Sequence, residues 1–304
     1  MKFALFIPTL NAGPRWGQVV EAIQSQSTRP DAVLVVDSGS VDGTAELASS
    51  AGFEVEHINP SEFDHGATRM LALQRFADCD VIVYLTQDAV PRDRHAFSHL
   101  LAALASDDAI AAVAGRQLPD IDASVFARHS RGYNYPDQSA VRSSSDIAEF
   151  GIKSAFLSNS FAAYDRAALE AVGGFPQRII FGEDMYVAAK LLKAGRKVAY
   201  ASDACVYHSH NYTPMQEFRR YFDMGVFHAR ECWLRREFGG AEGEGVKFVR
   251  SEIDYLLKHA FWRIPEGGLR TMFRYAGFRL GLIEKRLPVW LKMQLAMNKG
   301  CFKE

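Results

Sequence analysis

Acidic side chains follow several apolar segments of this chain, and these acids are the residues best suited to chemistry. Asp37 ends the run "AVLVVDS", and Asp88 follows the run "VIVYLTQ". Glu183 and Asp184 stand together just before the helical pattern "MYVAAKLLKAG". A carboxylate in such a place can accept hydrogen bonds from a ligand, hold a divalent cation or remove a proton from a substrate.

Asp88 is a single acid at a position where a metal site would commonly use two. Magnesium and manganese ions take oxygen ligands and keep several waters, so one carboxylate together with phosphate oxygens of a ligand suffices. His208 and His210 lie two residues apart in "ACVYHSHNYTP", which places them on one face of an extended segment. Two histidines can bind a divalent metal or serve as hydrogen-bonding groups at a strand end, and the residues alone leave both open.

Two further stretches suit a nucleotide ligand. In "VVDSGSVDGT", Asp37 fits donors such as a base imide N–H or ribose hydroxyls, whereas Asp42 fits a helix cap equally well. In "FDHGATR", Gly66 allows a turn, and Arg69 follows in the first turn of a helix, where it can face a diphosphate. The alternative for Arg69 is a surface arginine near a capped helix start.

The adjacent acids Glu183 and Asp184 precede a helix. One acid there complements the helix dipole, so the second is free to act as a general base.

The elements that position these residues alternate through the first half of the chain. Strand-like runs at 2–8, 32–38, 53–58, 80–86 and 109–117 alternate with helical spacing at 15–27, 39–52, 65–77 and 92–106. This order predicts an α/β fold with a mostly parallel sheet and helices on both faces, in which ligands bind beyond the carboxyl ends of the strands. We expect a surface loop, suited to act as a lid, over 133–146.

Composition narrows the function classes. The chain has 304 residues, of which 48% are hydrophobic and 23% charged, a composition typical of a globular protein. Its net charge is −1, so it has no overall positive charge that would favour binding to nucleic acid. Its four scattered cysteines form no disulfide framework, which fits a reducing cytoplasm.

Neither G-x-G-x-x-G nor a P-loop occurs, which argues against a hydride-transfer enzyme and a P-loop NTPase. The opening "MKFALFIPTLNAG" is read as a first strand rather than a signal peptide.

The C-terminal part is helical and basic. From Val246 to the end, twelve Lys/Arg stand against five Asp/Glu, with aromatic residues between them. This pattern predicts peripheral membrane contact, with an additional helical subdomain or a homodimer interface as alternatives. The expected division is a catalytic domain over 1–213 and a helical extension over 214–304.

The motifs "IPTLNAG", "VVDSGSVDGT", "LTQDAVP", "GGFPQRIIFGED" and "VYHSH" occur in this order over residues 2–212. Together they resemble the inverting nucleotide-sugar glycosyltransferases of the GT-A fold, the large family-two group. "FDHGATR" and "TQDA" look like bacterial rhamnosyltransferases of O-antigen and surface polysaccharide synthesis. The resemblance implies metal-dependent transfer of L-rhamnose from dTDP-L-rhamnose to a saccharide acceptor, with a lipid-linked saccharide favoured, on the cytoplasmic side of the inner membrane.

The resemblance also implies roles for individual residues. Base and ribose binding falls to Pro8, Thr9, Asn11, Asp37 and Ser38. Arg69 approaches the diphosphate, Gln87 bonds the sugar or a phosphate, and Asp88 with His208 binds Mg²⁺ or Mn²⁺. Asp184 is the general base, with Glu183 as its partner in the acid pair.

Three alternatives remain beside this interpretation. The donor can be a UDP-sugar instead. A nucleotidyltransferase would carry a G-x-G-T-R-style loop after the first strand, and "IPTLNAG" is not one. A non-catalytic nucleotide-sugar-binding module would keep the base-binding acids but need neither Asp184 nor Asp88.

Overall fold

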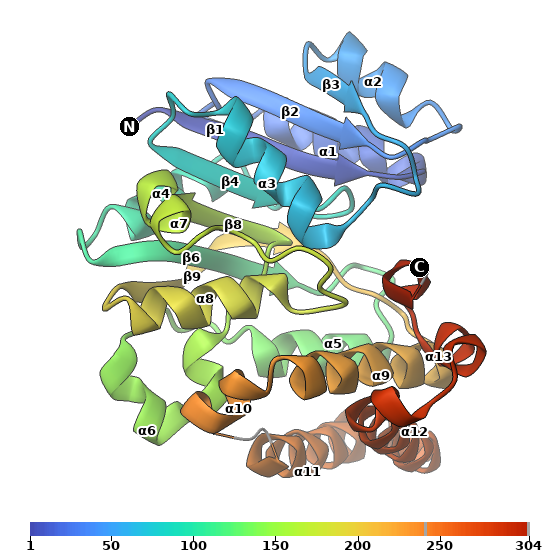
Figure 1. Ribbon diagram of the computed structural model, residues 1–304. Helices are drawn as coiled ribbons and strands as arrows, with labels where there is room; N and C mark the ends of the chain where they lie inside the picture. Colours follow the sequence, from blue (N-terminus) through green and yellow to red (C-terminus); the bar gives the residue numbers. More distant parts are fainter. Residues whose placement is uncertain (240–241, 303–304) are drawn as a thin grey trace.

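A nine-stranded sheet forms the centre of the computed structural model, which describes residues 1–239 and 242–302 (Figure 1). Its strand order is β3-β2-β1-β4-β8-β6-β9-β5, and β7 pairs with β9 beside this path. The strands are β1 Phe3–Thr9, β2 Ala32–Asp37, β3 Glu54–His57, β4 Val81–Leu85, β5 Val90–Pro91, β6 Ile110–Leu118, β7 Ala140–Arg142, β8 Phe161–Asp165 and β9 Lys197–Tyr207.

Helices follow most of the strands and then continue alone to the end of the chain. The α-helices are α1 Trp16–Gln24, α2 Thr44–Ser50, α3 His65–Arg75, α4 Ala96–Leu104, α5 Val125–Asn134, α6 Ile147–Phe150, α7 Arg166–Ala171, α8 Glu183–Lys193, α9 Pro214–Arg230, α10 Cys232–Phe238, α11 Glu242–His259, α12 Ile264–Leu282 and α13 Val289–Leu295. Short 3₁₀ turns are η1 Gly13–Arg15, η2 Ser144–Asp146, η3 Gly151–Ala155, η4 Phe261–Arg263, η5 Glu284–Arg286 and η6 Lys299–Phe302.

The sheet is mixed. β1 pairs in parallel with both β2 and β4, and β2 pairs in parallel with β3. β8 then runs antiparallel between β4 and β6, and β6 pairs in parallel with β9. The predicted α/β class is therefore confirmed, and the parallel half that we expected is joined to its second half through the antiparallel strand β8.

Alternate side chains of the strands enter two cores, one on each face of the sheet. On β1, Phe3, Leu5 and Ile7 pack against α1, α2 and α4, whereas Ala4 and Phe6 join a core with α3, α7 and α8. A strand buried on both faces reads as a continuous apolar run, and this is the pattern of β1. The second core also includes side chains of α9, so this C-terminal helix shares a core with the sheet and with α8.

Two strand pairings bring distant polar residues together. Thr9 at the end of β1 lies opposite Asp37 at the end of β2. The short strand β5 pairs antiparallel with the end of β9, with Val90 opposite Tyr207. This second pairing places the turn after β4 beside the residues that follow β9.

Two local expectations were wrong. The segment 133–146 is not only a surface loop, because β7 lies within it and pairs antiparallel with β9. Gly66 does not supply a turn: it lies in the first turn of α3 and is absent from the glycines with positive φ. A Cβ there would overlap the carbonyl oxygen of Pro176, so close packing explains this glycine.

The long helices α9 and α12 pack along each other through glycine. Figure 1 shows them at the end of the molecule opposite β2 and β3. A Cβ at Gly277 or Gly281 of α12 would overlap backbone carbonyl oxygens of α9. Beside these contacts, Arg274 bonds two buried carboxylates, Glu217 of α9 and Glu252 of α11. Close backbone approach and a buried ion network therefore hold these three helices together.

We expect Gly281→Ala to lower the free energy of unfolding by roughly 1–3 kcal/mol, because the added methyl group overpacks the helix contact. Gly268→Ala is the matched control, since this glycine of α12 is exposed and a methyl group added to it would meet no other atom within 4 Å. That control should gain up to about 1 kcal/mol from helix propensity. Urea unfolding measures both variants, and equal stability of the two would contradict the packing argument.

Candidate functional site

A cavity of about 1750 Å³ opens at the carboxyl ends of β4, β6 and β9. Its walls come from the sheet ends, the first turn of α8, and helices α5, α9, α11 and α12. Three of the predicted site residues line it, namely Asp88, Asp184 and His208. The structure therefore brings the proposed metal residues and the proposed base into one space.

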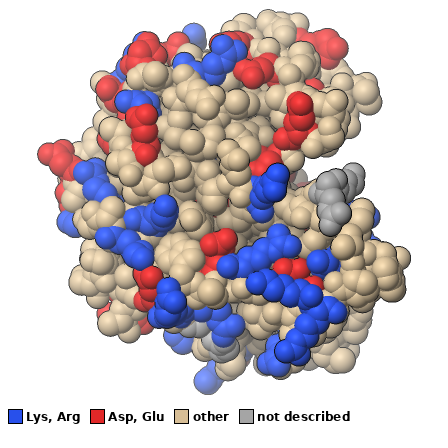
Figure 2. Space-filling view, in the orientation of Figure 1, with Lys and Arg blue, Asp and Glu red and all other residues tan. Residues whose placement is uncertain are grey.

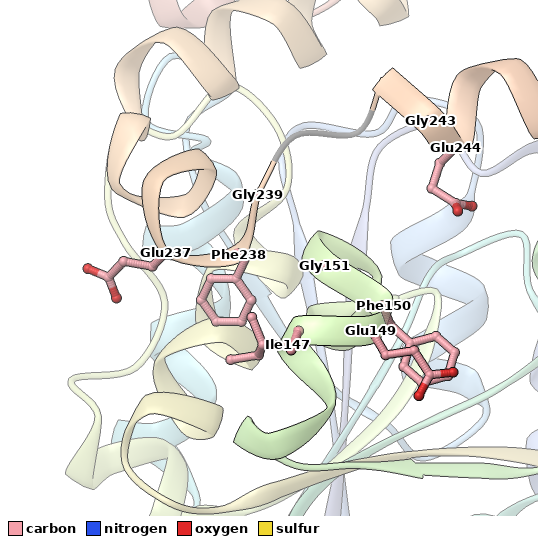
Figure 3. Close-up of a pocket in the computed structure, with 10 residues that line it drawn as sticks. Ile147, Glu149, Phe150, Gly151, Glu237, Phe238, Gly239, Gly243 and Glu244 are labelled. Atoms are coloured by element: carbon pink, nitrogen blue, oxygen red, sulfur yellow. The ribbon is translucent and has the colours of Figure 1, made fainter.

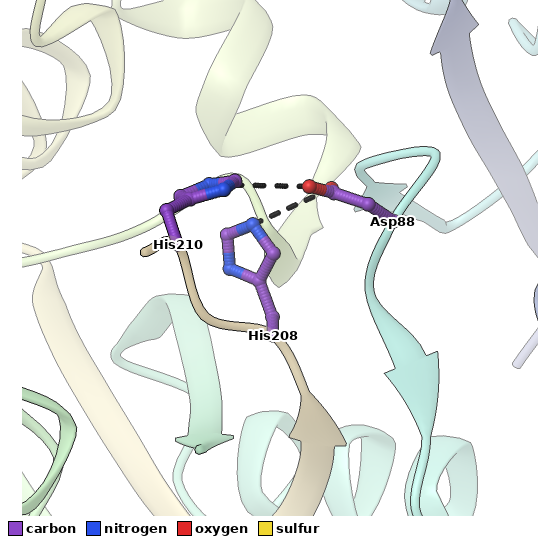
Figure 4. A group of neighbouring side chains, drawn as sticks. All are labelled: Asp88, His208 and His210. Atoms are coloured by element: carbon purple, nitrogen blue, oxygen red, sulfur yellow. Dashed lines mark ion pairs between the residues drawn. The ribbon is translucent and has the colours of Figure 1, made fainter. Parts of the chain in front are cut away.

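Asp88 faces two histidines. Figure 4 shows the three side chains converging from the turn after β4 and from the segment after β9. Asp88 Oδ1 lies 3.4 Å from His208 Nε2, and Asp88 Oδ2 lies 3.9 Å from His210 Nε2. One ligand atom from each residue lies within 4.8 Å of the other two. The geometry is that of a group able to hold one metal ion.

Gln117 fixes the orientation of His208. Its Nε2 donates to Ser158 Oγ at 2.9 Å, and its Oε1 lies 2.8 Å from His208 Nδ1. In a neutral imidazole this bond places the proton on Nδ1, so Nε2 presents its lone pair to the carboxylate of Asp88. Two lone pairs facing each other at 3.4 Å are the arrangement that a cation between them would stabilise.

The charge states of these residues suit metal binding. Burial, and then the neighbouring His208, lower the pKa of His210 to about 4, so its imidazole is neutral and free to bind near pH 7. Burial acts to raise the pKa of Asp88, but in the absence of a cation, hydrogen bonding and charge from a protonated His208 outweigh burial, so the pKa is lowered. Imidazole ligands suit a transition-metal ion better than magnesium, which prefers oxygen. The site thus offers one carboxylate and two imidazoles to a divalent cation.

The two acids at the start of α8 face different surroundings. Gly182 caps this helix in the left-handed conformation with φ 72°, and Glu183 and Asp184 form its first turn. Glu183 Oε1 lies 3.2 Å from Arg69 Nη1 and accepts a hydrogen bond from Asn159 Nδ2 at 3.3 Å. Burial opposes its charge, yet Arg69 and its other partners lower the pKa of Glu183. Glu183 is therefore an ionised, buried group paired with arginine.

Asp184 lies toward the cavity. Asn159 N donates to Oδ2 at 3.2 Å and Met185 N donates to Oδ1 at 2.8 Å, which fixes the carboxyl group. Burial, and then the negative charge of Glu183, raise the pKa of Asp184 well above the usual range. Two neighbouring carboxyl groups with separated pKa values are typical of acid–base sites. A carboxylate with a raised pKa is a stronger base, which suits proton removal from a hydroxyl.

Arg69 lies behind Glu183, away from the cavity lining. It is 5% exposed, so the alternative of a surface arginine is wrong. Its Nη1 also donates to the carbonyl of His65 at 2.9 Å, and its own carbonyl accepts from Tyr84 Oη at 3.1 Å. Arg69 is thus engaged with Glu183, and its approach to a diphosphate stays a prediction.

The predicted base- and ribose-binding residues lie together at the ends of β1 and β2. Asp37 is buried, and its Oδ2 accepts from Thr9 Oγ1 at 2.8 Å and from Ser40 Oγ at 2.5 Å. Its Oδ1 accepts from the backbone N–H groups of Gly39 and Ser40. Burial opposes ionisation, but these bonds lower the pKa of Asp37. Asp37 thus holds the loop after β2 in one shape.

Neighbouring side chains connect this loop to the other strand ends. Ser38 Oγ donates to the carbonyl of Thr9 at 3.0 Å, and Pro8 lies opposite Val36 in the sheet. Asn11 has a positive φ of 45° and accepts a bond from Val41 N at 2.9 Å.

Gln87 performs a similar connecting role. Its Oε1 accepts from Leu10 N at 2.7 Å, and its Nε2 donates to Leu10 O at 3.2 Å. Gln87 therefore ties the turn before Asp88 to the loop after β1. Asp42, whose Oδ2 accepts from Gly13 N, joins that loop to the start of α2, in line with the capping alternative.

The sequence analysis missed several residues of the site. Gln117 contacts His208 and Asn159 contacts the acid pair, while Arg131 and Arg220 add positive charge to the cavity wall. Gln117 is a polar residue at the carboxyl end of an apolar strand, a signal that could have identified it. Asn159, Arg131 and Arg220 carry no comparable signal, since only tertiary packing brings Asn159 to the acid pair and the two arginines to the cavity.

A second, smaller hollow of about 440 Å³ lies between α6 and the region where α10 ends and α11 begins (Figure 3). Figure 3 shows Glu149 and Glu237 pointing away from each other, so its acidic groups do not converge. The larger cavity is therefore the candidate active site.

Known proteins are similar to this chain in sequence. Residues 4–173 match the model of the family described as glycosyl transferase family 2. The O-antigen chain rhamnosyltransferase RfbN of Salmonella typhimurium is 50% identical over 301 residues, which cover 99% of this chain and 96% of the relative. The O-antigen chain rhamnosyltransferase WbaN of Salmonella anatum is 48% identical over 299 residues, which cover 98% and 95%.

Solved structures share the fold at low identity. The mannosyltransferase PcManGT of Pyrobaculum calidifontis, solved with GDP-Man and Mn²⁺, has a TM-score of 0.64 at 18% identity, over 94% of this chain and 88% of that one. TarS of S. aureus, solved with UDP-GlcNAc, has a TM-score of 0.52 at 14% identity, over 94% and 92%. These similarities confirm the predicted GT-A fold class. The family model and the two relatives confirm the predicted family: this chain belongs to glycosyl transferase family 2 and is an enzyme, a glycosyltransferase.

Proposed function

We propose that the enzyme transfers L-rhamnose from dTDP-L-rhamnose to a hydroxyl group of a lipid-linked saccharide, with inversion at the anomeric carbon. The observation that carries the proposal is the placement of Asp184 and the Asp88–His208–His210 group in one cavity. The names of the two relatives, which are about half identical to this chain, favour rhamnose as the sugar and O-antigen as the product.

Asp184 acts as the general base. It accepts the proton of the acceptor hydroxyl as that oxygen attacks the anomeric carbon and the nucleoside diphosphate leaves. Glu183 does not share this role, because it is buried against Arg69 and keeps the pKa of Asp184 raised through its charge. Arg69 and Asn159 accordingly position and tune the base.

Asp88, His208 and His210 hold a divalent ion, for which Mn²⁺ is the better fit. When bound, such an ion supplies positive charge to the leaving diphosphate. Asp88 alone among them is an anion, so the affinity for metal should be low without donor and should rise when the diphosphate adds its own oxygens.

The strand ends of β1 and β2 bind the base and ribose. Pro8, Thr9, Asn11 and Ser38 shape this edge, and Asp37 orders the loop that closes it. Gln87 acts by fixing the turn that carries Asp88, since both polar atoms of its side chain bond the backbone of Leu10.

The remaining features suit an acceptor held by the C-terminal half. We assign residues 1–213 to the catalytic domain and 214–304 to the acceptor side, because α9, α11 and α12 supply the cavity wall away from β1 and β2. Reaction in the cytoplasm, at the inner face of the membrane, follows from a nucleotide-sugar donor and a lipid-linked acceptor.

We expect Asp184→Asn to lower turnover by roughly 10²–10⁴-fold, because the amide keeps the size of the side chain but cannot accept the proton. Donor binding should stay near that of the wild type. The measurement is dTDP release from dTDP-L-rhamnose with a lipid-linked saccharide acceptor, alongside thermal stabilisation by the donor. Glu149→Gln serves as a control for loss of an acid elsewhere. Turnover within a few-fold of wild type would refute the base, and equal use of UDP-sugars would refute the donor.

The pH profile reports the charge coupling between the two acids. Asp184 must be ionised to accept a proton, so activity is lost as the pH falls through its raised pKa. In Glu183→Gln the neighbouring negative charge is gone, so the pKa of Asp184 falls and the acidic limb of kcat moves to lower pH. A limb that stays in place, or moves to higher pH, would show that the charge of Glu183 does not act on the base.

Removing a metal-site residue should weaken Mn²⁺ binding directly. We expect Gln117→Leu to lower the affinity for Mn²⁺ by roughly 10–100-fold, because His208 loses the partner that orients its ring. His210→Ala should weaken binding at least as much. Calorimetric titration of Mn²⁺ in the presence of dTDP measures both, with exposed His95→Ala as the control. Unchanged affinity in both variants would place the ion elsewhere.

A further inference from the structure

Helix α12 exposes large apolar residues on one side, although Phe273 and Leu280 pack against the core on the other. The residues buried on this helix are Gly267, Arg270, Arg274, Gly277 and Gly281. On its other side, Leu269, Met272 and Tyr275 are 44%, 68% and 64% exposed. A helix on the surface of a globular protein normally directs its apolar residues toward the core. The exposed side of α12 therefore suits an apolar neighbour rather than water alone.

The preceding segment continues this surface. Leu257 near the end of α11 is 58% exposed, while its neighbour Leu256 is buried. Phe261 and Trp262 of η4, which joins α11 to α12, are 64% and 67% exposed. We call Leu257, Phe261, Trp262, Leu269, Met272 and Tyr275 the outer apolar surface. Large exposed aromatic side chains that are grouped in this way mark an interaction site.

Positive charge lies beside the outer apolar surface: Lys258 follows Leu257 in α11, and the guanidinium of Arg279 lies 5.9 Å from the ring of Tyr275. The exposed cations of this region without a carboxylate partner in the described parts of the chain are Arg250, Lys258, Arg279, Lys285 and Arg286. Figure 2 shows many Lys and Arg in the lower part of the visible face, over the C-terminal helices, with a few acids among them. Because the whole chain has a net charge of −1, this positive region is local. This positive region suits a partner with a negatively charged surface.

We propose that the outer apolar surface docks on an anionic lipid bilayer, with Phe261 and Trp262 entering the headgroup layer and the cations beside this surface facing lipid phosphates. Amphipathic aromatic rings and basic residues are the side chains that bind such an interface. Among residues 1–239 and 242–302, no helix is long and apolar enough to cross a membrane. The contact is thus a peripheral one, on the surface of the bilayer.

The docking surface adjoins the active site. Met272 and Tyr275 belong to the outer apolar surface and also line the catalytic cavity, together with Arg250 and Arg279. A bilayer on this surface faces the mouth of the cavity, so an acceptor with a lipid tail can present its sugar to Asp184 while its tail stays in the membrane. Membrane binding stands independently, and only this role in acceptor delivery rests on the proposed function.

Flotation of the full chain with vesicles tests the proposal. The wild type should float with vesicles that contain phosphatidylglycerol and remain behind with pure phosphatidylcholine. Phe261→Ser combined with Trp262→Ser should lower the bound fraction about tenfold or more, because the two aromatic side chains that would insert into the lipid headgroup layer are lost. Lys285→Glu combined with Arg286→Glu should weaken binding to the anionic vesicles. The matched control is Leu47→Ser combined with Ile121→Ser, which removes exposed apolar groups elsewhere and should float normally.

Two further measurements separate the possible failures. Release of dTDP from dTDP-L-rhamnose without acceptor should be the same in the wild type and in the Phe261/Trp262 variant, which shows that the variant is folded. Absence of that activity in the wild type would count against the proposed function and leave flotation as the test of docking. Failure of the wild type to float, or equal flotation of the variant, would overturn the proposal. A wild-type dimer that the variant dissociates, seen by analytical ultracentrifugation without flotation, would assign the surface to self-association instead.

Discussion

The buried ion pair between Arg69 and Glu183 is the interaction on which the active site depends. Arg69 comes from α3, beside the parallel half of the sheet, and Glu183 begins α8 on the second half. Breaking a buried pair of this kind leaves an uncompensated charge and commonly costs about 3–5 kcal/mol. The pair therefore joins the halves and keeps Glu183 ionised. Since that charge adds to burial in raising the pKa of Asp184, one structural contact also sets the strength of the proposed base.

A second constraint comes from the sheet. Strand β5 has only two residues, yet its pairing with the end of β9 fixes where Asp88 lies relative to His208 and His210. Gln117 and Gln87 then hold the two sides of this group, one through the ring of His208 and the other through the backbone of Leu10. In the proposed metal site, the fold brings two imidazoles to the single carboxylate.

The C-terminal helices complete the cavity and give it a different character on each side. Toward the sheet ends it presents acids and histidines, and toward α11 and α12 it presents arginines and apolar side chains. Helix α12 can expose large apolar residues on one side because glycine contacts with α9 and ion pairs of Arg270 and Arg274 hold its inner side. Close backbone approach and buried ion pairs occupy this inner side together with Phe273 and Leu280, while Leu269, Met272 and Tyr275 stay exposed on the outer side.

Much of the architecture could be predicted from the sequence. Apolar runs such as those of β1 and β4 alternate with amphipathic helices, and this local pattern was sufficient for the α/β class and for the order of the elements. The order of the motifs along the chain was sufficient to predict the family. The same strand-end rule located Asp37, Asp88 and His208, although their roles remain predictions.

What the sequence alone could not provide depends on contacts between residues far apart in the chain. The inserted antiparallel strand β8, and the pairing of Arg69 with Glu183, arise from packing between segments separated by dozens of residues. Asn159 was missed for this reason, because nothing in its local sequence indicates that it bonds both acids. Sequence by itself determined which residue types follow each strand; tertiary structure alone decided which of them meet, because burial and charge pairing act through space rather than along the chain.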